Sequence, residues 1–585
     1  MASYAISVTD SVYSSLTSNV WTLLVSLSRT SVTGLLKRLQ VGQLEIRTDS
    51  GVWKFGDPAL IRSKEYNREA IANSATASAG ARISPIPAGA TPGVEGPSPT
   101  TILSSSKGVG TTAPASTSAA YKKTDTIRAT NAPQAVLIVK DDAFWVRMFV
   151  GADLGFAESY MLGEMETPDL GACFELFIQN RVAISELSVG LVSSVMSWVQ
   201  GQLNKRYANT RSGSLKNIGA HYDISNAMYA AFLSADMTYS SAVFPTLDAD
   251  ITGPLYRSVM EDSNASVETF INGHSQRSAE TGAVRRLHHR GPRIDHPDSA
   301  SSPAEDELLA ADELEDGQLR KLRLHIERAN IRRGDHVLEI GTGWGSFSLE
   351  AVRLTGCMVD TLTLSIEQKA LAEQRIAAAG LSSKIKVHLM DYRDMPASWT
   401  GRFDRIVSIE MLEAVGIEFL STYFACLDRV LKPNNGVVSI QCITIPEVRY
   451  KKYIQQTDFI RKWIFPGGVL PSVTAIIDAV EKGTDGRLVL DTAHAIGPHY
   501  SRTLREWRIR FEKNFEDFIK PALLMDHDDI RGLAPEEQAK EVEIFRRKWI
   551  YYFVYCEVGF TQRTIGNHIL SFTREGNVTL PVGCA

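Results

Sequence analysis

HVLEIGTGWGSFSLEAV, residues 336–352, is the part of the sequence that indicates the fold most clearly. It begins with a mostly apolar run, His336 to Ile340, and ends with a segment from Ser346 that suits a helix. Between them stand Gly341, Thr342, Gly343, Trp344 and Gly345. Glycines allow a sharp turn from strand to helix and let a ligand approach the backbone without a Cβ in the way. The stretch therefore predicts a strand, a nucleotide-binding turn and a helix.

Two kinds of nucleotide site share such a turn. The GxGxxG pattern of NAD sites is incomplete here, because the residue three positions beyond Gly343 is Ser346. The polar ends of the runs TLTLSIEQ and HLMDY suit ribose hydroxyls and adenine. These features favour an S-adenosylmethionine site. Asp360, about twenty residues after the first glycine, keeps a NAD-dependent dehydrogenase open as the alternative.

Further apolar runs follow the glycine turn, with helical segments between them. They are MVDTLTLS (358–365), KIKVHLMD (384–391), RIVSIEM (405–411) and GVVSIQCITI (436–445). Alternating strands and helices at this spacing are typical of a mostly parallel, doubly wound sheet. The predicted fold class is therefore α/β, doubly wound and Rossmann-like.

Composition and charge narrow the class of protein. The chain has 585 residues, of which 44% are apolar and 22% charged, and its formal net charge is −5. This excludes a wholly disordered or fibrous chain and gives no overall basic field for nucleic acid.

The six cysteines form no CxxC pair, which argues against a structural metal and fits a reducing compartment. The apolar stretch VWTLLVSLS near the N-terminus is too short to span a bilayer. We expect a cytoplasmic protein that meets membranes only at their surface.

Two stretches divide the chain. Residues 74–130 are rich in Ser, Thr, Ala, Gly and Pro and are expected to be disordered, while residues 262–312 are expected to form a mobile insertion. QLEIRT and VWKFGD bracket the turn DSG and predict a β-hairpin, and residues 169–181 read as a helix. We expect a smaller α+β N-terminal domain over residues 1–200 and a nucleotide-binding domain over residues 201–585.

Seven segments in order give the chain a resemblance to a known family. They are HYDISNAMYAAFLSADMTYSSAVF, VLEIGTGWGSFSLEA, LTLSIEQKALAEQRI, SIEMLEAVG, DFIRKWIFPGGVLPS, GPHYSRTLREWRIRF and YYFVYCEVGF. Together they resemble the cyclopropane-fatty-acyl-phospholipid synthases and the mycolic acid cyclopropane synthases. The likeness runs from Leu215 to the C-terminus apart from the second insertion, and more loosely over the N-terminal block.

The resemblance implies transfer of the methyl group of S-adenosylmethionine to a cis double bond in a phospholipid acyl chain, followed by proton loss that closes a cyclopropane ring. An alkene that attacks the sulfonium methyl becomes a carbocation, so the site must exclude water and present electron-rich faces. Aromatic residues in and near the family segments suit this need, although core packing is the simpler role for each one. They are Tyr239, Phe244, Trp463, Phe465, Tyr500, Trp507, Phe511 and Tyr552.

In the family a bicarbonate ion removes the proton. Glu413 in SIEMLEAVG matches the family carboxylate, and a proton shared with the anion would relieve their repulsion. By the same likeness Tyr500 donates a hydrogen bond to bicarbonate and Ile443 contributes its backbone.

The chain departs from the family pattern at three positions. Ser241 stands where many members have cysteine, Gln441 where bacterial members have histidine, and Ala414 where histidine follows the glutamate. Cys556 matches a family cysteine, but its apolar and aromatic neighbours suggest a buried thiol of raised pKa.

The same residue-by-residue likeness places the cofactor. Tyr239 and Ser240 are expected to close over its methionine end, and Gly341 to Gly345 to bed its backbone. Thr363, Leu364, Ser365 and Gln368 match the ribose-contacting segment, with Ile409 also near the cofactor. Asp391 and Tyr392 are expected to flank the adenine.

The likeness also implies docking on a phospholipid bilayer and a possible homodimer. The N-terminal domain and the segment 451–472, with Lys451, Lys452, Arg461 and Lys462 among apolar residues, are the candidates for docking. Two rival functions stay open at this point. One is a related methyltransferase that leaves a methyl branch on the lipid, and the other is a catalytically silent lipid-binding relative.

Overall fold

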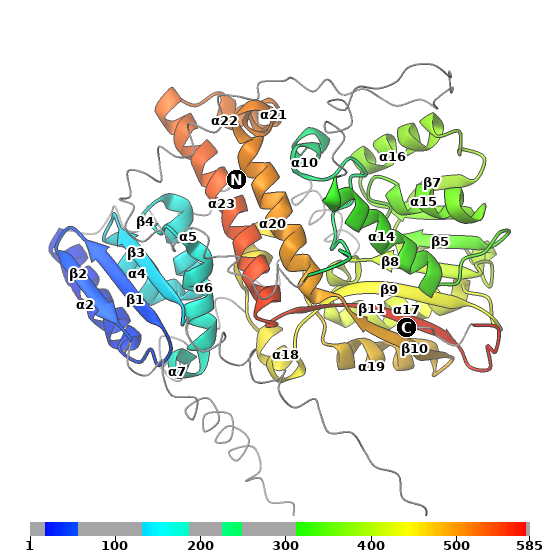
Figure 1. The fold of residues 1–585 in the computed structure, drawn as a ribbon, viewed down its shortest axis with the longest axis horizontal. Helices are drawn as coiled ribbons and strands as arrows, with labels where there is room; N and C mark the ends of the chain where they lie inside the picture. Colours follow the sequence, from blue (N-terminus) through cyan, green and yellow to red (C-terminus); the bar gives the residue numbers. More distant parts are fainter. Residues whose placement is uncertain (1–17, 57–131, 186–224, 248–311, 581–585) are drawn as a thin grey trace, which may run out of the picture.

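The computed structural model describes residues 18–56, 132–185, 225–247 and 312–580. In these ranges the chain forms two sheets, a small one near the N-terminus and a large one in the C-terminal half. Both expected insertions lie essentially outside the described residues, as does the expected domain boundary at residue 200. Figure 1 shows two long helices standing between the two sheets.

The large sheet has seven strands in the order β10-β11-β9-β8-β5-β6-β7. Strands β5 to β9 are mutually parallel, while β11 is antiparallel to both β9 and β10. The order reverses direction beside β5, as expected for a doubly wound sheet, so the predicted fold class is confirmed. The bounds are β5 (His336–Ile340), β6 (Met358–Thr363), β7 (Ile385–Leu389), β8 (Arg405–Ile409), β9 (Val437–Thr444), β10 (Leu488–Ala495) and β11 (Gly566–Arg574).

Helices cover both faces of this sheet. Apolar residues of α14, α15 and α16 pack on one face with Val337, Val359 and Val407, and those of α17 and α19 pack on the other with Leu338, Ile406 and Val438. Each helix therefore buries one apolar stripe against the sheet. The bounds are α14 (Glu313–Arg328), α15 (Ser346–Thr355), α16 (Ile366–Ala378), α17 (Leu420–Val430) and α19 (Val473–Thr484).

The N-terminal sheet has the order β2-β1-β3-β4. Strands β1 and β2 form the expected hairpin across the DSG turn, and β3 adds parallel to β1. The helix expected at residues 169–181 is also present, as α6. The bounds are α2 (Ser18–Leu36), β1 (Gln43–Thr48), β2 (Gly51–Phe55), β3 (Gln134–Val139), α4 (Ala143–Gly151), α5 (Asp153–Leu162), β4 (Met165–Glu166), α6 (Leu170–Gln179) and α7 (Arg181–Ser185).

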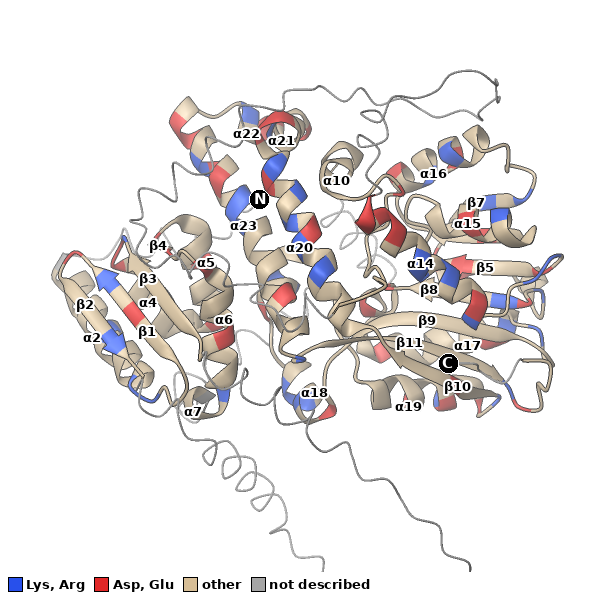
Figure 2. Cartoon of the chain, in the orientation of Figure 1, with Lys and Arg blue, Asp and Glu red and all other residues tan. Residues whose placement is uncertain are grey.

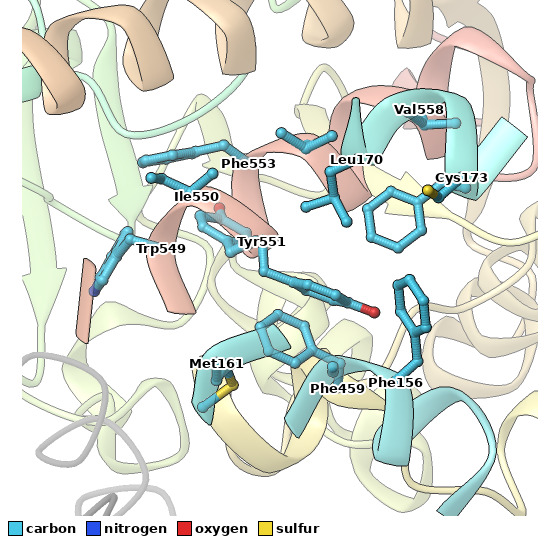
Figure 3. Packing of buried hydrophobic residues seen from close by; sticks show 14 of the residues in the cluster. Phe156, Met161, Leu170, Cys173, Phe459, Trp549, Ile550, Tyr551, Phe553 and Val558 are labelled. Carbon is cyan, nitrogen blue, oxygen red and sulfur yellow. The ribbon is translucent and has the colours of Figure 1, made fainter. Parts of the chain in front are cut away.

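Helices α20 and α23 join the two parts through one continuous aromatic core. Tyr551 of α23 contacts Phe156 of the N-terminal part and Phe459 of the C-terminal part (Figure 3), with ring centroids 6.4 and 4.5 Å apart. It also contacts Phe174 of the N-terminal part at 5.0 Å. Because T-shaped and tilted aromatic pairs stabilise beyond their buried area, this contact fixes the small domain against the large one. The remaining bounds are α10 (Asn226–Phe232), α18 (Glu447–Tyr453), η7 (Ile460–Ile464), α20 (Gly497–Lys513), η8 (Phe515–Ile519), α21 (Lys520–Asp526), α22 (Asp528–Arg531) and α23 (Pro535–Thr561).

The described residues show no separation of acidic from basic side chains between the two domains. Acidic and basic residues are interspersed over both domains, including along α20 and α23 (Figure 2). Among the helices that the structure describes, none is both long and apolar enough to cross a membrane.

Candidate functional site

The glycine turn lies at the carboxyl end of β5, as the sequence predicts. Gly341, Gly343 and Gly345 have φ values of +100°, +50° and +86°, which residues other than glycine rarely adopt. A Cβ built on Gly343 would meet no atom within 4 Å, so a ligand can approach the backbone there. Trp344 is buried, and its indole N–H donates to Asn226 Oδ1 at 2.8 Å. The turn thus fits S-adenosylmethionine.

The expected ribose segment follows β6. Ser365 caps α16 and accepts from Gln368 N, and the Thr363 hydroxyl donates to Gln368 Oε1 at 2.9 Å. Leu364 is half-buried, as is Ile409 at the end of β8. These contacts hold the segment rigidly at the same edge of the sheet as the glycine turn. Its contact with a ribose stays a prediction.

The two expected adenine neighbours have protein partners. Asp391 accepts from the Arg393 guanidinium at 2.8 and 2.6 Å, and Tyr392 packs its ring against Tyr423 with centroids 4.9 Å apart. Asp391 meets the adenine amine only if it shares an oxygen that Arg393 already uses. Their role at adenine stays a prediction.

A carboxylate that the sequence analysis did not single out, Glu410, occupies the centre of the site. Its Oε1 accepts from Ser241 N at 3.1 Å, Gln441 Nε2 at 2.7 Å and Asn567 Nδ2 at 2.6 Å. Its Oε2 accepts from the Tyr500 hydroxyl at 2.6 Å. Four donors from four separate segments therefore converge on one side chain directly after β8.

Glu413 lies three residues further on and is bonded differently. Its Oε1 accepts from Ile443 N at 2.5 Å, whereas its buried Oε2 has no hydrogen-bond partner within the described part of the chain. Burial and the nearby charge of Glu410 both raise the pKa of Glu413. A buried carboxyl with few donors beside an anion holds its proton. Glu413 is therefore the neutral member of this acidic pair.

Two polar side chains of α14 support the site from behind. His325 is fully buried and contacts Ser439 Oγ at 2.9 Å and Gln441 Oε1 at 3.0 Å. Lys321, one turn earlier and also fully buried, donates to Ser240 Oγ at 2.7 Å. His325 thus orients the amide of Gln441 so that its NH2 group faces Glu410.

The buried His325 predicts a measurable acid sensitivity. Burial lowers the pKa of His325 to about 3. Between pH ~6.5 and that value the unfolded chain binds a proton that the folded chain does not. The free energy of unfolding therefore decreases by roughly 1.4 kcal/mol for each unit by which the pH is lowered in this range. We expect His325→Gln to lose this contribution. Urea denaturation of both proteins at pH 7.5 and 5.0 measures it, and parallel losses in the two proteins would contradict it.

Aromatic rings line the region beside the acidic pair. Tyr239 lies 5.0 Å from Trp507 and 6.4 Å from Phe465 between ring centroids, and its hydroxyl donates to the Tyr552 hydroxyl at 3.1 Å. Tyr500 stacks on Phe560 at 4.5 Å. The structure thus brings together five of the eight expected aromatics. Of the other three, Phe511 packs on Trp549, Phe244 stacks on His499, and Trp463 lies under Lys462.

The side chains of Cys556 and Ser241, two of the expected catalytic residues, are both occupied by protein contacts. Cys556 packs in the apolar core and burial raises its pKa, as expected for an unreactive thiol. The Ser241 hydroxyl donates to Ala242 O at 3.0 Å, so Ser241 serves the site through its backbone N–H. Among the described residues, no group of His, Cys, Asp and Glu is placed to hold a metal ion.

Tyr500 and Ile443, which the likeness assigns to bicarbonate, are already engaged, as are Ser241 and Gln441 at two of the positions where the chain departs from the family. The hydroxyl of Tyr500, the N–H of Ser241 and the amide of Gln441 bind Glu410, and the N–H of Ile443 binds Glu413. A bicarbonate ion here would meet the charged Glu410 beside the neutral Glu413 and compete for their donors. The arrangement therefore does not fit the expected bicarbonate ion.

Asp360 does not support the dehydrogenase alternative. It lies within β6, and its carboxylate accepts from His336 and His388 at 2.6 Å each and from Arg402 at 3.0 Å. These partners hold the pKa of Asp360 well below its usual range. Asp360 is a structural ion-pair centre rather than a ribose ligand.

Two of the expected lipid-facing cations instead contact protein. Arg461 is 5% exposed and lies over the ring of Tyr453 at 4.1 Å, and Lys462 pairs with Glu158 of α5 at 2.5 Å. Arg461 thus contacts its own segment and Lys462 the N-terminal domain. Docking of this segment on a bilayer stays a prediction. Lys451 and Lys452 of α18 are exposed.

Comparisons with known proteins show what the chain is similar to. A family model described as mycolic acid cyclopropane synthetase matches residues 209–254 and 306–569. Tuberculostearic acid methyltransferase UfaA1 of Mycobacterium tuberculosis is 32% identical over 76% of this chain and 84% of its own. Cyclopropane-fatty-acyl-phospholipid synthase of Escherichia coli is 33% identical over 45% of this chain and 60% of its own. The solved cyclopropane synthase MmaA2 of M. tuberculosis aligns with 62% of this chain and 98% of its own, at 20% identity and a TM-score of 0.42.

Proposed function

Because the chain belongs to the mycolic acid cyclopropane synthetase family, we propose that it transfers the methyl group of S-adenosylmethionine to the cis double bond of an unsaturated phospholipid acyl chain. The observation that carries the proposal is the acidic pair Glu410 and Glu413, set beside aromatic rings and next to the glycine turn. Met411 lies within 3.5 Å of a Cβ built on Gly341, which places this pair at the mouth of the turn.

The residues of the chain meet the demands of the reaction in turn. S-adenosylmethionine supplies the methyl group when it is bound. The rings of Tyr239, Phe465 and Trp507 exclude water and offer electron-rich faces to the carbocation that follows methyl addition. A carboxylate close by stabilises the same charge. Proton loss from the added methyl group then closes a cyclopropane ring.

A second product is favoured by one observation. The relative that aligns over the larger share of this chain is named a tuberculostearic acid methyltransferase, not a cyclopropane synthase. A 1,2-hydride shift from the methylated carbon to the cationic carbon, followed by loss of a methyl proton, would form an exocyclic C=C bond and give a methylene branch instead of a ring. Both products add one CH2 group to the lipid, so fragmentation in mass spectrometry must distinguish them.

The experiment that tests the proposal uses the purified full chain. It is incubated with methyl-labelled S-adenosylmethionine and vesicles of a monounsaturated phospholipid, and a saturated phospholipid serves as the control. We expect label in the unsaturated acyl chain only. Cofactor binding in calorimetry without label in any lipid would reject the proposal, and absence of cofactor binding would favour a silent lipid-binding relative.

The glycine turn gives a sharper test of the cofactor site. In Gly343→Val, a branched side chain at φ +50° fills the open space over the turn. We expect S-adenosylmethionine to bind at least ten-fold more weakly, as measured by calorimetry. Gly380→Val is the matched control, because Gly380 also has a positive φ, +70°, and open space, but it follows α16 away from the site. Equal loss of affinity in both variants would contradict the assignment.

A further inference from the structure

The hydrogen bonds around Glu410 describe an anion site that the chain fills itself. Backbone, amide and hydroxyl donors from Ser241, Gln441, Asn567 and Tyr500 surround one carboxylate at 2.6–3.1 Å. Ser241, Gln441 and Asn567 are each fully buried. One of the four, Tyr500, is a residue that the family likeness assigns to bicarbonate, and Ser241 and Gln441 stand at positions where the chain departs from the family pattern. The side chain of Glu410 thus takes the hydrogen bonds of an external anion.

The backbone at Glu410 is held in an unusual conformation. Its φ is +48°, in the left-handed region that favours glycine. Its own N–H donates to Gln441 O at 2.8 Å, directly after β8 ends at Ile409. Strained residues of this kind persist where surrounding contacts hold them and cluster at functional sites. Here the strain turns the carboxylate towards the four donors.

Charge within the pair points to Glu410 as the ionised member. Burial raises the pKa of Glu410, while Tyr500, the Ser241 N–H and the nearby Lys321 favour its charged form. Glu413 has an Oε2 without a partner in the described structure. One negative charge shared by two close carboxyl groups settles on the group with more donors.

We propose that Glu410 is the catalytic base of this chain and replaces bicarbonate. The inference rests on the proposed methyl transfer and concerns the step after it. A C–H bond of the newly attached methyl group breaks, its electron pair forms the ring bond to the adjacent cationic carbon, and the proton goes to Glu410. For a methylene branch, a 1,2-hydride shift first moves the positive charge to the methylated carbon, and the electron pair of the broken C–H bond then forms the exocyclic C=C bond. Oε2 is the accepting atom, because Oε1 already takes three donors. The proton leaves to water after product release.

A hydrogen-bonded carboxylate is basic enough for this step. A carbocation with an adjacent methyl group is a strong acid, so the base needs position more than strength. Lys321, which donates to Ser240 Oγ, helps to balance the charge of Glu410.

The test compares wild-type protein with Glu410→Gly in the labelled-methyl assay, in carbonate-free buffer with and without added bicarbonate. Glycine accepts φ +48° and leaves the four donors around the space of the lost carboxylate. We expect wild-type activity to be unchanged by bicarbonate. We expect Glu410→Gly to lose at least 100-fold in rate and to regain at least 10-fold with bicarbonate or formate. Glu410→Gln, which fills the same space, should lose activity without rescue.

The outcomes separate this inference from the proposed function. Wild-type activity that falls more than ten-fold without bicarbonate would overturn it, as would Glu410→Gly with wild-type activity in carbonate-free buffer. If no lipid is labelled by wild-type protein under any condition, the proposed function itself fails. If Glu410→Gly does not fold in a thermal scan, the bicarbonate dependence of the wild type still decides.

Discussion

Replacing Trp507 by alanine is expected to lower the free energy of unfolding by about 4 kcal/mol. The side chain is fully buried in α20, and its ring lies 5.0 Å from Tyr239, 5.9 Å from Tyr500 and 6.4 Å from Phe232 between centroids. Removing it leaves a cavity that these large rings cannot fill without leaving their own contacts. Urea denaturation of the two proteins at pH 7.5 measures the difference.

The control is Phe518→Ala. Phe518 is an aromatic residue of η8 just beyond α20, and it is 60% exposed. We expect its removal to change stability by no more than about 0.5 kcal/mol. Trp507→Phe should recover most of the stability, since it keeps a ring in the cavity. A loss of 1 kcal/mol or less in Trp507→Ala would show that the aromatic region is loosely packed.

This prediction also bears on function, because Trp507 contacts both Tyr239 and Tyr500. Tyr500 holds Glu410, and Tyr239 belongs to the segment expected to close over the cofactor. The same packing therefore stabilises the fold and positions the groups that face the carbocation. In Trp507→Phe we therefore expect the rate of methyl transfer to fall, although most of the free energy of unfolding is retained.

The fold followed from the sequence because its main signals are local. Strands β5, β6, β7, β8 and β9 are short runs of Val, Ile and Leu, and the glycine turn separates the first from its helix. Period, length and glycine position suffice for such elements. The pairing of β10 with β11 is not local, since β11 follows β10 only after α20 and α23. The equally non-local pairing of β11 with β9 sets Asn567 opposite Ile443 and so brings it to Glu410.

The site was predictable only in part, for a physical reason that Glu410 illustrates. SIEMLEAVG contains two glutamates, and likeness to a family singles out Glu413. Only the left-handed turn at Glu410 sends the first glutamate into the same space. The buried pair Lys321 and His325 reads in sequence as part of the polar face of a helix. Ser439 and Gln441 on alternate positions of β9 were the available signal, since polar residues inside a buried strand need partners.

Lys321→Met is expected to remove the cation that balances Glu410. Lys321 is fully buried, and burial lowers its pKa to about 8, against the opposing charges of Glu410, Asp236 and Glu339. At pH 7 it is therefore mostly protonated. Removing one member of a buried charge group leaves the other charges uncompensated and costs roughly 3 kcal/mol. Urea denaturation measures this loss, and Lys520→Met, at an exposed pair with Glu516, is the control with an expected change below about 0.5 kcal/mol.

The same substitution should move the pH profile of methyl transfer. Without Lys321 the charged form of Glu410 is less favoured, so its pKa rises and the base stays protonated up to a higher pH. We expect the acid limb of the rate to shift upward by about one pH unit or more, with the rate at high pH largely retained. Rates in the labelled-methyl assay from pH 6 to 9 test this. A uniform loss of rate at every pH would mean that Lys321 only holds Ser240 in place, and that the base at this site does not depend on its charge.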